Sequence, residues 1–298
     1  MLEVSTRESC AISEIERKSD GLYLKSEYGL LRLSPVSDSI IRISFTRRDA
    51  FEENYGIGIL PHANHAKWDY SEHEGSVYLE TACLKLDVNR KSGSIKYYGK
   101  DGKLLLAERE QESRTLEEFD SYKTIIDENT VIEEIETPDG LKRKIKEATR
   151  VFDRKLYRTR LYLEWQDDEK LYGLGQAQEG VLNLRGTTQY LHQANMKIAI
   201  PMLVSTKGYG ILMATGSPVI FSDTHYGSYL YAEASVQMDF YFIAGENFDE
   251  IIKGYRFLTG KAVMLPLWAF GFIQSQERYK TQQEILDIVK KHKERNIG

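Results

Sequence analysis

The sequence has 298 residues, of which 41% are hydrophobic and 29% charged, and its formal net charge is −5 at pH 7. This length predicts roughly two domains, and the hydrophobic share excludes an intrinsically disordered chain. The mean hydropathy is −0.45, and no apolar run approaches the roughly 20 residues of a membrane helix, so no membrane partner is expected. The mildly acidic isoelectric point of about 5.8 argues against a nucleic-acid partner.

The two cysteines, Cys10 and Cys83, are too few for a disulfide framework or for a zinc site built mainly of thiolates. The first eight residues contain no apolar stretch of the kind that signal peptides carry. A cytoplasmic location is therefore the simplest expectation.

Most of residues 1–245 is predicted to be β-structure. Short runs rich in Val, Leu, Ile and Tyr alternate with turns, which is typical of an antiparallel meander, over residues 76–80, 84–88, 94–98 and 103–106. Many short strands joined by tight turns favour a β-sandwich over an α/β fold. This part of the chain is therefore expected to be a sandwich domain.

The next part of the chain is dense in charge between residues 108 and 170, which we interpret as solvated strand faces and loops. Two strands are predicted here, over residues 131–136 and 144–151. The turn Pro138-Asp139-Gly140 lies between them, where Pro presets φ and Gly accepts a positive φ.

The pattern changes near Asn247, where helices replace strands. Asn247 and Glu250 are spaced as a helix cap, and Gly260 is placed as a stop. A second helix is predicted to begin after the capping box formed by Thr281 and Glu284. The interpretation is a sandwich over residues 1–245 followed by a helical linker over 246–264.

The remaining residues, 265–298, predict the start of a second domain. Residues 265–273 are an apolar, aromatic run that can be a buried strand, and the second helix follows it. A strand, loop and helix form the repeating unit of a parallel α/β fold or a β/α barrel. Because such a barrel needs about 250 residues, either this single unit packs on the sandwich or the chain stops inside a larger domain.

Two motifs invite functional interpretations that the residues do not support. The segment Leu171-Tyr172-Gly173-Leu174-Gly175-Gln176 resembles a dinucleotide fingerprint, but Gln178 replaces the third glycine and no helix pattern follows. Its glycines are better explained by a backbone turn. The cluster His62, His65 and His73 suggests a metal site, but ordinary loop histidines are the better interpretation. Neither a cofactor nor a metal is expected.

Several motifs in order resemble glycoside hydrolase family 31. The segment Gln274-Ser275-Gln276-Glu277-Arg278-Tyr279 and the apolar run before it resemble the opening of the family's catalytic barrel. Upstream, the resemblance is carried in the expected order by Leu171-Tyr172-Gly173-Leu174-Gly175-Gln176, Gln193-Ala194-Asn195, Ile200-Pro201-Met202, Gly208-Tyr209-Gly210 and Leu258-Thr259-Gly260. The match is close from residue 171 to the end and looser over residues 76–108.

This resemblance implies a mainly β chain: an N-terminal galactose-mutarotase-like β-sandwich, then the first βα unit of an incomplete (β/α)8 barrel over residues 265–298. It also implies retaining cleavage of α-glucosides or α-xylosides by an aspartate nucleophile and an aspartate acid/base, without a cofactor. In the family, both aspartates lie on later barrel strands, so they are expected beyond residue 298. The chain alone is expected to be inactive, and its expected partners are an α-linked oligosaccharide and the remainder of its own barrel.

The resemblance also implies substrate-binding residues, although none that is catalytic. The segment that follows the first barrel strand would line the sugar pocket through Gln274, Gln276, Arg278 and Tyr279. A loop of the sandwich that resembles one reaching toward the barrel mouth adds Gln193 and Asn195.

Two other functions remain open at this point. One is a non-catalytic carbohydrate-binding or docking β module with a helical tail. The other is a free-standing mutarotase-like enzyme, which would need a histidine and an acid in the sandwich cleft that the sequence does not identify.

Overall fold

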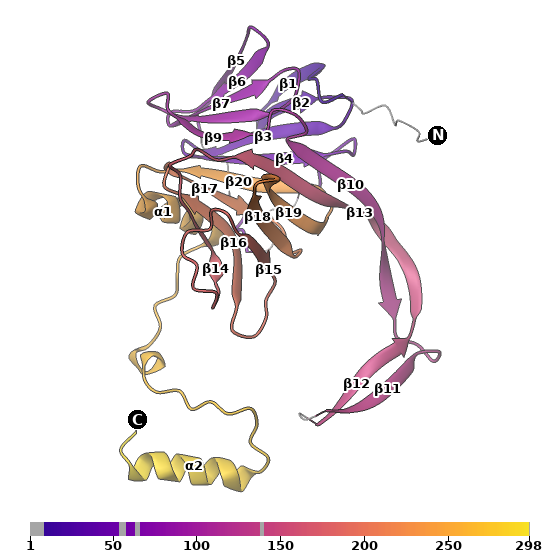
Figure 1. Ribbon diagram of the computed structural model, residues 1–298, viewed down its shortest axis with the longest axis vertical. Coiled ribbons are helices and arrows are strands. Elements are labelled where there is room, and N and C mark those ends of the chain that lie inside the picture. The colour runs from indigo at the N-terminus through magenta and orange to yellow at the C-terminus, as the bar shows by residue number, and fades with distance from the viewer. Residues whose placement is uncertain (1–8, 54–57, 63–65, 138–139, 298) are drawn as a thin grey trace. The chain divides into compact units, whose positions relative to one another are not determined.

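A computed structural model of the chain describes residues 9–53, 58–62, 66–137 and 140–297. The chain divides into two compact units, Met1–Gly260 and Lys261–Gly298. The first unit is a β-sandwich, as the sequence predicts, and its two large sheets are drawn in Figure 1. No helix within the described ranges is both long and apolar enough to cross a bilayer.

The first sheet has eight antiparallel strands. In spatial order they are β1 (Glu14–Lys18), β2 (Gly21–Lys25), β3 (Leu30–Ser37), β4 (Ile40–Thr46), β20 (Met238–Ala244), β17 (Tyr209–Met213), β16 (Ile198–Ser205) and β14 (Leu171–Gln176). The pairing of β4 with β20 brings the beginning and the end of the sandwich sequence together.

The second sheet contains the predicted meander and is also antiparallel. Its order is β15 (Thr188–Leu191), β18 (Val219–Thr224), β19 (Gly227–Ser235), β13 (Thr149–Glu164), β9 (Leu104–Glu108), β8 (Ile95–Gly99), β7 (Leu84–Asn89), β6 (Ser76–Glu80) and β5 (Asp69–His73), with β10 (Arg114–Ile125) paired to β13.

The core of the sandwich follows from alternation along the strands. In β7, Leu84, Leu86 and Val88 are buried and the residues between them are partly exposed, because successive side chains of a strand point to opposite faces. In β20 both faces are buried. Phe240 and Phe242 join the core between the sheets, whereas Tyr241 and Ile243 belong to a second cluster on the outer face of the first sheet.

Helix α1 (Phe248–Thr259) contributes to this outer cluster. Ile251 and Leu258 are fully buried there, which by area bookkeeping stabilises the folded state by about 1.5–3 kcal/mol for each side chain. Both predicted ends are confirmed, since the Asn247 side chain accepts from Glu250 N and Gly260 ends the helix with φ 88°.

The charge-dense part of the chain forms a two-stranded ribbon. β13 pairs with β19 only between Tyr157 and Leu163, whereas its pairing with β10 reaches Thr149, so both strands continue beyond the sheet (Figure 1). A separate hairpin of β11 (Val131–Thr137) and β12 (Gly140–Glu147) follows. β12 begins earlier than predicted, and Pro138 and Asp139 of the predicted turn lie outside the described residues.

The second unit differs from the sequence prediction in one respect. Its helix α2 (Gln282–Glu294) is confirmed, with Thr281 as the N-cap. The strand expected over residues 265–273 is not formed, and a 3-10 helix, η1 (Leu267–Phe270), takes part of its place. A buried parallel strand needs hydrogen-bonded neighbours and cover on both faces, and the described residues of this unit supply neither.

Candidate functional site

The glycine-rich motif of residues 171–176 forms strand β14, and the structure explains its glycines. Gly173 and Gly175 have φ values of 103° and 99°, and Leu174 between them has φ 64°. A Cβ atom on Gly175 would lie 1.9 Å from the Ile198 carbonyl oxygen, far inside van der Waals contact. The glycines therefore serve the close, irregular pairing of β14 with β16.

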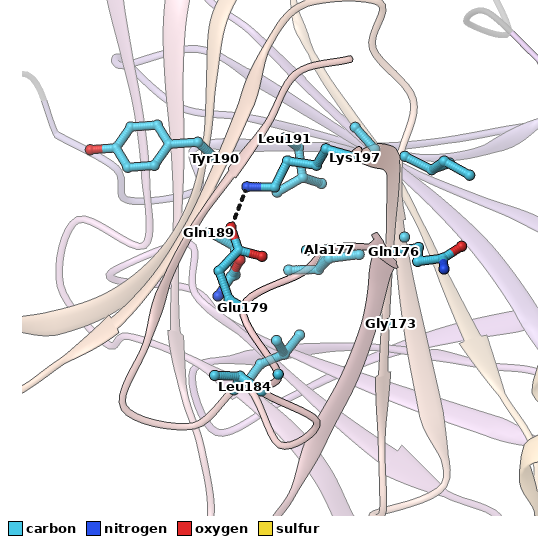
Figure 2. A pocket seen from close by; sticks show the side chains of 15 residues that line it. Gly173, Gln176, Ala177, Glu179, Leu184, Gln189, Tyr190, Leu191 and Lys197 are labelled. Atoms are coloured by element: carbon cyan, nitrogen blue, oxygen red, sulfur yellow. Dashed lines mark ion pairs between the residues drawn. The ribbon is translucent and has the colours of Figure 1, made fainter. Parts of the chain in front are cut away.

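A small pocket lies beside this pairing, between β14, the segment after it and the start of β16 (Figure 2). Its volume is about 60 Å³. This is room for roughly two water molecules, and a sugar ring does not fit. The pocket is therefore too small to hold a ligand of that size.

An ion pair joins two segments at the rim of this pocket. Lys197 Nζ lies 2.9 Å from Glu179 Oε1, as the dashed line in Figure 2 shows. The hydrogen bond from Lys197 lowers the pKa of the Glu179 carboxyl, so that this group is ionised at neutral pH. The pair ties the segment after β14 to the loop before β16.

That loop, residues 192–197, contains two of the predicted substrate-binding residues. It connects β15 of the second sheet with β16 of the first sheet, and all its residues except Lys197 are exposed. The side-chain amide of Gln193 donates to the Lys197 carbonyl at 2.7 Å and accepts from Ala199 N at 3.3 Å. Within the described ranges the Asn195 carboxamide has no hydrogen-bond partner.

The other four predicted residues lie in the second unit, between η1 and α2. Gln274, Gln276 and Arg278 are exposed, and Tyr279 is partly buried. Gln276 Nε2 donates to the Arg278 carbonyl at 2.9 Å and approaches Glu284 Oε1 at 3.3 Å. Arg278 also lies 3.5 Å from Glu277. Of these four residues, Gln276 and Arg278 are in contact, and Gln276 supports the turn into α2.

Two of the three clustered histidines, His62 and His73, lie in the part of the chain that the structure describes. No group of three metal-ligating side chains occurs there, and His65 lies outside the described residues. His62 Nδ1 lies 3.0 Å from the Leu60 carbonyl oxygen, and its ring contacts Tyr241 and Phe257. Burial lowers the pKa of His62, as expected for a neutral packing residue.

Sequence reasoning missed the Glu179–Lys197 pair and the bonding of Gln193. The partners of the ion pair are 18 positions apart and lie in segments without periodicity. No local pattern could have shown that they meet.

Comparison with known proteins supplies the context for this site. Residues 30–221 match the family model described as the "Glycosyl hydrolase 31 N-terminal galactose mutarotase-like domain". The match includes most strands of the sandwich and the loop that carries Gln193 and Asn195.

Individual relatives also include glycosidases of this family. An α-xylosidase from Saccharolobus solfataricus is 41% identical over 150 residues, which are 47% of this chain and 20% of the relative. A family 31 glucosidase from Pseudescherichia vulneris, itself uncharacterized, is 27% identical over 290 residues, or 96% of this chain and 52% of the relative.

A solved structure of an α-xylosidase from a soil metagenome, complexed with xylose, gives a TM-score of 0.73. It is 27% identical, and the match covers 95% of this chain and 40% of that one. The chain thus spans between a fifth and about half of the length of these relatives.

Proposed function

The chain belongs to glycoside hydrolase family 31, and from this premise we propose that it is the N-terminal part of a retaining α-glycosidase acting on α-glucosides or α-xylosides. The observation that carries the proposal is the family match over residues 30–221, together with the α-xylosidase relative at 41% identity. The substrate class is an α-linked oligosaccharide.

We propose the same domain organisation as above: a sandwich over residues 1–245, a linker over 246–264, and the first βα unit of a barrel over 265–298. The exposed apolar side chains of the second unit support this organisation. Leu267 is 89% and Trp268 79% exposed, and Phe270, Phe272 and Ile273 are also exposed. Contiguous apolar surface of this kind marks a missing interaction partner, which in the proposal is the rest of the barrel. The segment then becomes a strand once neighbouring barrel strands pair with it.

In the proposed mechanism the chemistry belongs to residues beyond 298. A retaining glycosidase holds two carboxyl groups about 5–5.5 Å apart, one as nucleophile and one as acid/base, and passes through a covalent glycosyl-enzyme. The residues of this chain contribute substrate binding. Gln274, Gln276, Arg278 and Tyr279 would follow the first barrel strand at the C-terminal face, where barrel active sites lie, and the loop with Gln193 and Asn195 would contribute from the sandwich.

An assay of the complete gene product on nitrophenyl α-xyloside and nitrophenyl α-glucoside, side by side, tests this proposal. We expect release of nitrophenol from at least one substrate by the complete protein and none by the 298-residue chain. Turnover by the chain alone would overturn the placement of the catalytic residues. An inactive complete protein whose sandwich still binds sugar in calorimetry would favour the binding-module alternative.

A further inference from the structure

The hairpin of β11 and β12 is almost fully exposed. Every residue from Val131 to Glu136 and from Leu141 to Glu147 is open to solvent, and neither strand pairs with a third strand among the described residues. A two-stranded ribbon is at best marginally stable in water, because it can bury little apolar surface. Its open edges and apolar side chains are also a template for association. The hairpin therefore has the properties of a contact surface.

The pairing register divides the hairpin into two unlike faces. Ile132 lies opposite Ile145, and directly opposed residues point to the same face. These two side chains are 50% and 42% exposed, and Leu141 on the same face is 72% exposed. We call this side of the hairpin the apolar face, and its residues are Ile132, Glu134, Glu136, Leu141, Arg143 and Ile145.

Charge is divided between the two strands. β11 contains three acids and no cation, whereas β12 contains one acid, Glu147, and four cations, Lys142, Arg143, Lys144 and Lys146. Within the hairpin Arg143 Nε lies 2.9 Å from Glu134 Oε1, but both side chains are more than half exposed, so this pair stabilises the hairpin little. A surface with one acidic and one basic strand is complementary to a second copy of itself, provided that unlike strands face each other.

Symmetry limits how two such hairpins can meet. Two identical chains most often associate about a two-fold axis. An axis normal to the hairpin sets equal edges side by side, and an axis across the strands sets equal strands over each other. Both arrangements bring acid to acid or cation to cation, which is unfavourable. Only an axis parallel to the strands places β11 of one copy over β12 of the other.

We propose that the apolar face of the β11–β12 hairpin binds the same face of a second copy of this chain, about a two-fold axis parallel to the strands. Rotation about this axis keeps each residue at its level along the strand. Ile132 therefore faces Ile145 of the partner subunit, and Glu134 faces Arg143 of the partner subunit. Facing sheets pack about 10 Å apart, a distance that a glutamate and an arginine can bridge together. The apolar contacts provide affinity, and the charges select the arrangement.

Charge reversal in the complete protein tests this arrangement, with association measured by sedimentation velocity over about 1–100 μM, since a small interface gives weak association. Glu134→Arg and Arg143→Glu should each weaken the homodimer about tenfold or more, because like charges then face each other. An equimolar mixture of the two variants should restore the dimer, although neither chain regains the ion pair within its own hairpin. A mixture that stays monomeric would show that the variants only loosen their own hairpins, and would overturn the proposal.

The double variant Glu134→Arg/Arg143→Glu guards against a folding defect. It keeps the pair within each hairpin and both pairs between hairpins, with their signs reversed, so it should associate as wild type does. Single reversals that leave association unchanged would contradict the pairing of unlike strands.

The opposite face of the hairpin supplies matched controls. Glu133 lies opposite Lys144 on that face, so Glu133→Arg reverses a charge of the same strand without touching the proposed interface. At about 0.15 M salt, where distant charges are screened, this variant should associate as wild type does. Ile132→Thr should weaken the dimer several-fold, and Ile135→Thr should not, since threonine keeps the strand propensity of both positions. Equal effects of the two threonine variants would overturn the assignment of the face.

Two further outcomes would also overturn the proposal. A complete wild-type protein that stays monomeric over this concentration range has no second copy on the hairpin, and slow hydrogen exchange of the hairpin amides would then show that the rest of its own chain covers it. An oligomer that none of these substitutions changes is held together by other surfaces. No glycosidase assay enters these measurements, so a failure here is distinct from a failure of the proposed function.

Discussion

Tyr97 of the second sheet stacks on Phe242 of the first, with ring centroids 4.4 Å apart. Phe242 also stacks with Tyr209 at 5.3 Å. Each tyrosine hydroxyl donates to a buried carboxylate, Tyr97 to Glu108 at 2.9 Å and Tyr209 to Glu169 at 2.5 Å. The core between the sheets therefore contains three aromatic rings in contact and a buried acid bonded to each tyrosine.

Removal of the first of these acids should destabilise the sandwich strongly. The side chains of Glu108 and its ion-pair partner Arg114 are 0% and 4% exposed. Glu108→Ala would leave the guanidinium buried without a countercharge, and we expect a loss of about 3–5 kcal/mol in the free energy of unfolding. Urea denaturation measures this loss. The exposed Glu110→Ala serves as control and should stay within about 0.5 kcal/mol of wild type; an equally small effect of Glu108→Ala would contradict the prediction.

One glycine of β14 and one in the segment after it give a matched pair of substitutions. Gly175 and Gly180 both have a positive φ, but only at Gly175 would a Cβ atom meet backbone, 1.9 Å from Ile198 O, whereas Gly180 has open space around it. Gly180→Ala should cost about 1 kcal/mol of stability from the backbone conformation alone. Gly175→Ala should cost about 3 kcal/mol or more, because β14 and β16 must also move apart. Thermal denaturation distinguishes the two, and equal effects would show that close approach is not what requires glycine.

The lowered pKa of His62 predicts a pH dependence of stability. Burial against Tyr241 and Phe257 disfavours the imidazolium in the folded chain. In the unfolded chain the His62 side chain has a pKa of about 6.5, so it binds a proton there at a higher pH than in the folded chain. The contribution of His62 is therefore present above the unfolded pKa and is lost as the pH falls through the lower, folded value.

Unfolding free energies of wild type and His62→Gln, measured between about pH 7.5 and 5.5, check this prediction. Wild type should lose more stability than the variant on acidification, by less than about 1 kcal/mol because the ring is only half-buried. Parallel profiles would show that His62 does not contribute.

The apolar surface of the second unit predicts a difference between the whole chain and its sandwich. A truncated chain of residues 1–260 retains every strand and α1. It lacks the exposed run that includes Leu267, Trp268 and Ile273, so it should bind a hydrophobic dye such as ANS less strongly and aggregate less. Comparison of dye fluorescence and light scattering at equal concentration tests this. Stronger dye binding by the truncated chain would mean that residues 261–298 are needed to fold the sandwich.

Local patterns made much of this fold predictable. The alternation in β7 and the helix caps Asn247, Gly260 and Thr281 each depend on residues that are close together in the chain. The structure contains all of them. The strand expected over residues 265–273 is absent from the structure because it does not depend on local residues alone. The segment is apolar as expected, but a parallel strand needs neighbouring strands that no local pattern supplies.

The sequence could indicate the loop that carries Gln193 and Asn195, but not its internal bonding. The motif that contains Gln193 and Asn195 indicated the loop, but gave the two residues the same role. Their different bonding depends on Lys197, Ala199 and Glu179, which meet only after β14 and β16 have paired. Pairing of this kind is fixed by tertiary structure, as is the contact between Glu108 and Arg114.

The row of stacked rings also provides an optical signal. Burial raises the pKa of both Tyr97 and Tyr209 well above the usual value near 10. As a solution is made alkaline, accessible members of the 19 tyrosines lose their protons and gain the ultraviolet absorbance of phenolate, while these two stay protonated. These two tyrosines should ionise only when the sheets separate and expose them to solvent. The phenolate absorbance that they add at high pH therefore reports whether the two layers are still in contact.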